Sequence, residues 1–97
     1  MIVERYTWEA KPGRRDDAIE WCKKLAAREE NAGLTIRIYA TQFGVWNKVS
    51  MEVEYETEED RRKYWDGVEW TEELGEFVKT HHDMIGFGQT RELLRLV

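Results

Sequence analysis

The residues of this chain that could carry out chemistry gather in its last third. Both histidines, His81 and His82, lie there together with Tyr64, Trp65 and Trp70. An imidazole titrates near neutral pH and can accept or donate a proton. Aromatic rings bury large areas and need a surface to pack against. The combination indicates a pocket, but it names neither a reaction nor a substrate.

His81 shares one side of its expected helix with Leu74 and Phe77. A histidine on an apolar helix face is usually structural, and a binding or acid–base role is the alternative. His82 and Asp83 follow directly, and consecutive helical side chains do not converge on one ion. The sequence therefore predicts no metal site.

Composition excludes several classes of partner. The chain has 97 residues, of which 41% are hydrophobic and 36% charged, so residues 1–97 are expected to form a single globular domain. The net charge of −5 argues against a surface for nucleic acid or for an anionic membrane. No apolar run reaches the length of a membrane span and no leader segment is recognised, so we expect a soluble, cytoplasmic protein.

Cys22 is the only cysteine, which leaves no partner for an intrachain disulfide and fits a reducing compartment. Its place beside Ala18, Trp21 and Leu25 predicts a small buried hydrophobic residue rather than a reactive thiol.

Hydrophobic periodicity predicts the order strand, helix, two strands, broken helix, strand. Pro12 and Gly13 end the first strand, while Thr57 and Thr71 can cap the two pieces of the broken helix. This order closes as an α+β, ferredoxin-like β-α-β-β-α-β antiparallel sheet with two helices on one face. The expected elements are 2–10, 14–32, 34–41, 48–55, 57–66, 71–85 and 90–97.

The two central strands have a predicted register. A two-residue type II′ turn at Gly44-Val45 makes apolar residues face apolar ones and places polar residues on the opposite face. The predicted pairs are Phe43 with Trp46, Ile38 with Met51, Ile36 with Val53, Arg37 with Glu52 and Tyr39 with Ser50.

Two helices cover only one side of a four-stranded sheet. The other face carries polar residues of both charge signs, such as Arg37 and Glu52, and can face water or a second copy of itself across a two-fold axis. In the first strand Ile2, Tyr6 and Trp8 share a face, and neither face is clearly polar. We favour a homodimer.

At this point the chain resembles a known superfamily, the dimeric α+β barrels. The resemblance is carried by Trp8-x-x-x-Pro12-Gly13, by the helix that begins with acidic residues, and by the Tyr64-Trp65, Trp70 and Phe77-x-x-x-His81 helix that returns to a terminal strand. The branch it most resembles is that of the NIPSNAP-like proteins, with antibiotic-biosynthesis-type monooxygenases as near relatives. The resemblance implies a ferredoxin-like sheet that pairs into a dimeric barrel.

The resemblance also implies a ligand cavity between the helices and the sheet of each protomer. Ordinary core packing of the same residues is the alternative. Heme-degrading members of the superfamily use a histidine and a tryptophan on this helix, but they also rely on a first-strand asparagine that is absent here, so we expect no cofactor. Mapped onto this chain, the cavity would be lined by Tyr6, Trp8, Met51, Trp65, Trp70, Phe77 and His81.

The leading hypothesis is a small-ligand-binding protein of unassigned activity that takes a hydrophobic or aromatic ligand. The enzyme alternative is a cofactor-independent monooxygenase or isomerase acting on a small aromatic or polyketide-like compound, in which His81 or Tyr6 moves a proton. A third hypothesis is a structural or interaction module with a filled cavity.

Overall fold

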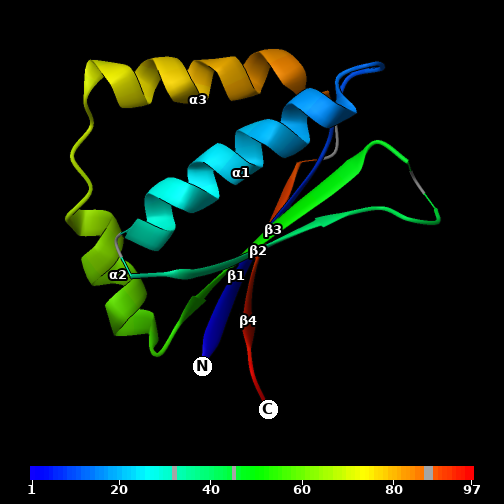
Figure 1. Cartoon of the computed structure of the whole chain (residues 1–97). Helices are drawn as coiled ribbons and strands as arrows, with labels where there is room; N and C mark the ends of the chain where they lie inside the picture. Colours follow the sequence, from blue (N-terminus) through cyan, green and yellow to red (C-terminus); the bar gives the residue numbers. More distant parts are fainter. Residues whose placement is uncertain (32, 45, 87–88) are drawn as a thin grey trace.

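Four antiparallel strands form one sheet in the order β2-β3-β1-β4 (Figure 1). The computed structural model describes residues 1–31, 33–44, 46–86 and 89–97. The predicted α+β, ferredoxin-like topology is confirmed. The elements are β1 (Ile2–Glu9), α1 (Arg15–Asn31), β2 (Thr35–Ala40), β3 (Lys48–Tyr55), α2 (Glu58–Asp66), α3 (Glu72–Met84) and β4 (Thr90–Arg95).

The helices lie on one side of the sheet. In Figure 1, α1 crosses above the strands, α3 lies beyond α1, and α2 stands at one end. Helix α1 packs against β2 and β3, α3 packs against α1, and α2 packs against β3. Since α3 is held mainly by α1, space remains between α3, α2 and the sheet.

The break in the second helical region has a local cause. Thr57 Oγ1 accepts a hydrogen bond from the backbone N–H of Asp60 at 3.1 Å, and Thr71 Oγ1 accepts one from Leu74 at 3.1 Å. Each threonine satisfies an N–H group that has no partner within its helix, so two separate helix starts are encoded. Both predicted caps are confirmed.

The predicted register of β2 and β3 is confirmed, because Ile38 pairs with Met51 and Arg37 with Glu52. The predicted tight turn is wrong in length. The last pair of the ladder is Ala40 with Val49, so Phe43 and Trp46 are not among its pairs. β2 ends at Ala40 and β3 begins at Lys48, so residues 41–47 connect the two strands. Val45, half of the predicted turn, lies outside the described residues.

Arg37 and Glu52 are cross-strand neighbours as predicted, but the ion pairs on this face join other partners. The Arg37 side chain forms an ion pair with Glu54 rather than with Glu52. Glu52 instead pairs with Arg5 of β1 at 2.7 Å. Diagonal neighbours on a twisted sheet are within reach of long side chains, which register alone does not reveal.

The core lies between α1 and the sheet, where alternate residues of β3 are buried. Cys22 is fully buried, and burial raises the pKa of its thiol to about 12. A thiol with so high a pKa is almost entirely protonated at neutral pH. The structure therefore supports the prediction of a small buried hydrophobic residue.

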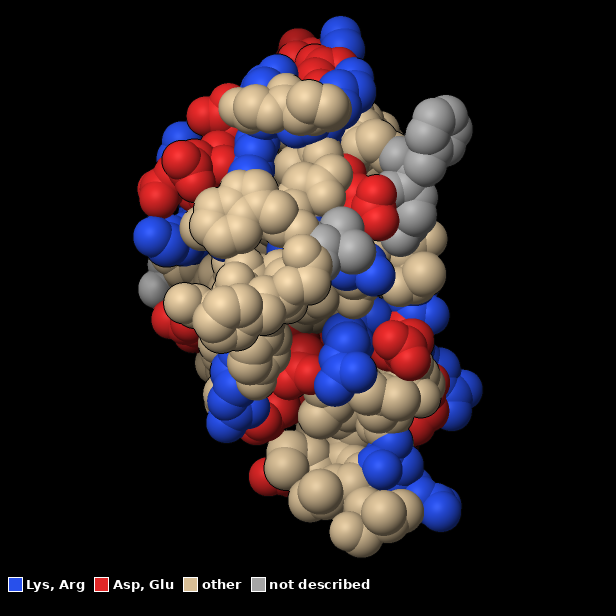
Figure 2. Space-filling model, turned by 90° about the vertical axis from the view of Figure 1, so that its right-hand side faces the viewer, with Lys and Arg blue, Asp and Glu red and all other residues tan. Residues whose placement is uncertain are grey.

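Charges of both signs are mixed on the face shown in Figure 2, with uncharged side chains between them. That face offers no extended basic area for a nucleic acid. In the parts of the chain that are described, no helix combines the length and apolar character needed to cross a bilayer.

Candidate functional site

A cavity of about 720 Å³ lies between the sheet and the three helices. The sheet and the helices both contribute to its walls. Side chains of β1 and β3 line it on the sheet side, and side chains of α1, α2 and α3 line it on the helix side. Aromatic rings contribute much of the lining. Those rings are Tyr6, Trp8, Trp21, Tyr55, Tyr64, Trp65 and Trp70.

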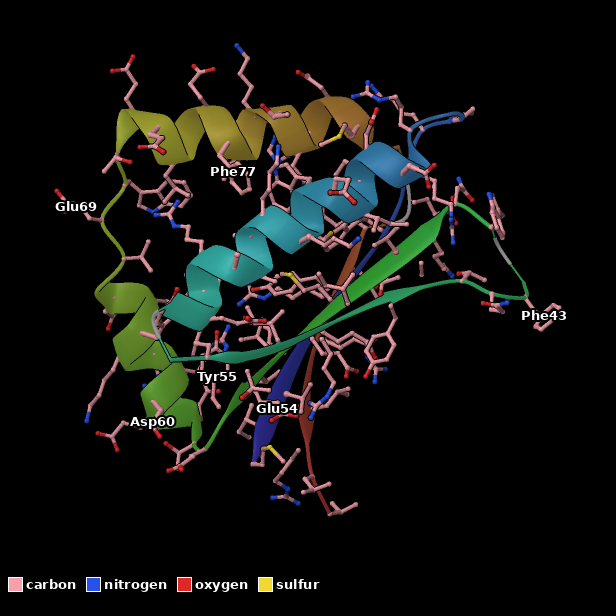
Figure 3. The ribbon with its side chains drawn as sticks, in the orientation of Figure 1. Phe43, Glu54, Tyr55, Asp60, Glu69 and Phe77 are labelled. Atoms are coloured by element: carbon pink, nitrogen blue, oxygen red, sulfur yellow. The ribbon has the colours of Figure 1, made fainter. Side chains whose placement is uncertain are left out.

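The structure brings together six of the seven residues that the sequence placed around a cavity. Tyr6, Trp8, Met51, Trp65, Trp70 and His81 line it. Phe77 does not, because its ring stacks on Trp21 with the centroids 4.6 Å apart, between α3 and α1. Figure 3 shows Phe77 pointing from α3 toward α1. Whether the six residues bind a ligand is a separate question of function.

His81 is buried in the cavity wall, with 6% of its surface exposed. Its ring meets Trp8 edge-on at 4.7 Å and lies 4.0 Å from the ring of Trp21. Burial, with a smaller contribution from His82, lowers the pKa of His81 to about 4. The imidazole is therefore neutral at pH 7. Its Nε2 atom has no hydrogen-bond partner among the described residues.

Trp21 holds α3 in place above the cavity. Its Nε1–H donates a hydrogen bond to the backbone carbonyl of Phe77 at 2.9 Å, and its ring contacts both Phe77 and His81. This single side chain of α1 thus positions the residue of α3 on which any acid–base hypothesis depends.

A buried carboxylate lies beside the cavity, on the same face of β1 as Tyr6 and Trp8. Glu4 is 0% exposed, and its Oε2 accepts hydrogen bonds from Arg61 at 2.7 and 2.9 Å and from Arg91 at 3.0 Å. Burial by itself would raise the pKa of Glu4. The hydrogen bonds from Tyr6 and Arg61 and the charges of Arg61 and Arg91 outweigh burial, so the pKa lies below its usual value.

Tyr6 is tied to this carboxylate. Its hydroxyl donates to Glu4 Oε1 at 2.5 Å. Burial and this hydrogen bond together raise the pKa of Tyr6 far above its ordinary value of 10. The phenol therefore keeps its proton, and at neutral pH it can orient a ligand but is a poor base.

The mouth of the cavity carries two tryptophans that are not fully covered. Trp65 is 39% exposed and Trp70 is 69% exposed. Trp65 lies in the last turn of α2 and Trp70 precedes the cap of α3, so the helix break brings both residues to the cavity. Partly exposed tryptophans that line a cavity are typical of a binding surface.

A metal centre finds no support in the described parts of the chain, where no three His, Cys, Asp or Glu side chains are grouped so that they could hold an ion. Polar groups that line the cavity include the neutral imidazole of His81, the hydroxyl of Tyr6 and the carboxylate of Glu29.

Comparison with known proteins shows that solved structures of NIPSNAP-like proteins share this fold. An uncharacterised NIPSNAP domain protein from Burkholderia xenovorans is similar with a TM-score of 0.81 and 14% identity, over 100% of this chain and 95% of that one. A NIPSNAP family protein from Agrobacterium tumefaciens has a TM-score of 0.79 and 16% identity, over 99% and 92% of the two chains. An antibiotic biosynthesis monooxygenase has a TM-score of 0.75 and 14% identity, over 100% and 99%.

At these identities the similarity establishes the fold and leaves the chemistry open. No family model and no curated protein matches the sequence. The predicted resemblance to NIPSNAP-like proteins and to antibiotic-biosynthesis-type monooxygenases is confirmed at the level of the fold.

Sequence reasoning missed two acidic residues at the site. Glu29 lines the cavity and is buried, although its neighbours Arg28 and Glu30 are exposed. Its spacing of four and eight residues from Leu25 and Trp21 puts it on the same helix face, which is a signal available in the sequence. Glu4 lies two residues before Tyr6 in β1, so the two side chains share the inward face of that strand. The sequence carries this signal as well.

Proposed function

We propose that this protein binds a small, largely apolar aromatic molecule in the cavity between its sheet and its helices. The observation that carries the proposal is a cavity of about 720 Å³ walled by aromatic rings, with two partly exposed tryptophans at its mouth. That volume lies within the range of small-molecule sites, and mainly apolar walls with a few polar groups are typical of them.

Filling the cavity tests this proposal directly. Val78 of α3 lines the cavity, and its replacement by tryptophan would occupy the space that the ligand needs. We expect the neutral dye N-phenyl-1-naphthylamine to bind the unmodified protein with an increase in fluorescence. Val78→Trp should weaken that binding about tenfold or more, which corresponds to about 1.4 kcal/mol.

Lys79→Trp is the matched control, because residue 79 is exposed and is not among the cavity-lining residues. It should leave the affinity for the dye unchanged. No fluorescence increase with the unmodified protein, or equal binding by Val78→Trp and the unmodified protein, would refute a ligand cavity and favour a structural or interaction module.

We further propose that the protein is a homodimer formed through the sheet face away from the helices. That face carries ion pairs of Arg5 with Glu52 and of Arg37 with Glu54, and a half-exposed Tyr39. Both charge signs on one surface allow it to match a rotated copy of itself. The shared fold with proteins of the dimeric α+β barrel superfamily supports the same arrangement.

Sedimentation equilibrium at micromolar concentration should give about twice 11.6 kDa. A stable interface should bury more than roughly 1,000 Å² in total. Tyr39→Glu, which adds a charge to this face at the edge strand β2, should shift the protein toward the monomer. Lys23→Glu, at an exposed position of α1, should not. A monomer in the unmodified protein would contradict the proposal.

Catalysis by proton transfer is the second candidate function, as a cofactor-independent monooxygenase or isomerase. Its support is the neutral imidazole of His81 in the cavity wall, a form that can accept a proton, with Tyr6 beside Trp8 in the same wall. Oxygen uptake with 1-naphthol, measured with the protein and without it, tests the monooxygenase form.

A further inference from the structure

One side chain in the cavity wall is not explained by an apolar aromatic ligand. Glu29 of α1 is 9% exposed and lines the cavity, and its Oε2 atom has no hydrogen-bond partner within the described ranges. A buried carboxylate normally has a positively charged partner or several hydrogen bonds, because losing its hydration is costly. Among the described residues, Glu29 therefore has no ion-pair partner that would supply a counter-charge.

The basic residues nearest to the cavity do not supply that counter-charge. Arg28 precedes Glu29 on α1, but its side chain is exposed and its charge offsets the effect of burial only in part. Lys63 of α2 also lines the cavity, yet it is largely exposed and forms an ion pair with Glu59 at 3.3 Å. The pKa of Glu29 accordingly stays above its ordinary value, with burial as the main cause.

Aromatic rings line the same cavity. Tyr55 and Glu29 both line it. Tyr55 is 6.3 Å from Tyr64, which meets Trp65 edge-on at 5.4 Å. The electron-rich faces of Tyr and Trp attract organic cations, and the attraction grows where water is excluded. A carboxylate together with several such rings is a recognised way to bind a protonated or quaternary amine.

We propose that the cavity selects organic cations, with an ammonium group placed against Glu29 and the aromatic rings and with an apolar or aromatic body filling the remaining space. This inference rests on the proposed ligand-binding function and specifies the ligand class. The ammonium supplies the counter-charge that Glu29 lacks, and Trp8 and Trp21 contact the apolar body.

Three probes of similar size and different charge test the inference. They are 2-phenylethylammonium, 2-phenylethanol and 3-phenylpropionate, each used to displace N-phenyl-1-naphthylamine from the protein. We expect the ammonium compound to bind about tenfold more tightly than the alcohol, and the carboxylate compound to bind most weakly. Glu29→Gln, which keeps the shape and removes the charge, should reduce the preference to about twofold or less.

Glu30→Gln is the matched control, since it removes the neighbouring carboxylate from an exposed position on the same helix. It should keep the full preference. Equal binding of the ammonium and alcohol compounds to the unmodified protein, preferred binding of the carboxylate compound, or an unchanged preference in Glu29→Gln would overturn the inference. In each of these cases the dye still binds, so the cavity function stands, whereas no dye binding would refute the proposed function itself.

Discussion

Replacing Arg61 by alanine is expected to lower the free energy of unfolding by about 3–5 kcal/mol. Arg61 donates two hydrogen bonds to Glu4, whose carboxylate is fully buried. Removing the guanidinium leaves that buried charge with Arg91 and the Tyr6 hydroxyl only. Urea unfolding followed by circular dichroism at pH 7 measures the change.

Arg62→Ala is the matched control for this prediction. Arg62 is the next residue of α2, its side chain is 70% exposed, and its ion pair with Glu58 is 3.9 Å long. Such surface pairs contribute little, so we expect a loss of about 0.5 kcal/mol or less. The Glu4→Gln/Arg61→Ala double variant should recover part of the loss, since residue 4 then carries no buried charge. Equal losses for Arg61→Ala and Arg62→Ala would contradict the proposed role of the cluster.

Replacing His81 by alanine should lower the free energy of unfolding by about 1–3 kcal/mol at pH 7. The imidazole fills the space between the rings of Trp8 and Trp21, and its removal leaves a void in the cavity wall. His82→Ala provides the comparison, because His82 is exposed, and it should change stability by about 0.5 kcal/mol or less.

The stability difference between the unmodified protein and His81→Ala should depend on pH. The pKa of His81 is about 4 in the folded protein and near 6.5 when unfolded. Between these values the unfolded chain binds more protons, so the unmodified protein loses stability as the pH falls from 6.5 toward 4. His81→Ala does not show this loss of stability, because it has no imidazole at position 81. Glu4 is present in both proteins, so its own effect on the pH dependence of stability cancels in the difference. The difference between the two should therefore shrink on acidification, and a constant difference would refute the low pKa.

The same His81 variant also separates a structural role from a functional one. If His81 is structural, His81→Ala loses stability but still binds N-phenyl-1-naphthylamine with an affinity close to that of the unmodified protein. A tenfold weaker affinity in a variant that remains folded would show instead that the imidazole contributes to ligand binding. The structural role is the expected outcome, because the ring is enclosed by two tryptophans.

Local patterns in the sequence were sufficient for most of the architecture. Alternation of apolar and polar residues set the register of β2 against β3, because a shift by one residue would expose the apolar set. The threonine caps located the starts of α2 and α3, because a side-chain oxygen three residues before an unpaired N–H is a local geometric feature. A helix cap depends only on residues within one turn of it, and a strand register depends on a strict two-residue repeat. Both can therefore be predicted from the sequence.

The tertiary structure alone decided the partners of the charged and aromatic residues at the site. Glu4 pairs with Arg61, 57 residues away, and with Arg91, 87 residues away. Phe77 leaves the cavity wall because Trp21 offers it a stacking surface 56 positions distant. Long side chains and rings can reach several neighbours, and only the packing of separate elements selects among them. For the same reason, only the packing of α1 against the sheet shows that Glu29 Oε2 is buried with no hydrogen-bond partner among the described residues.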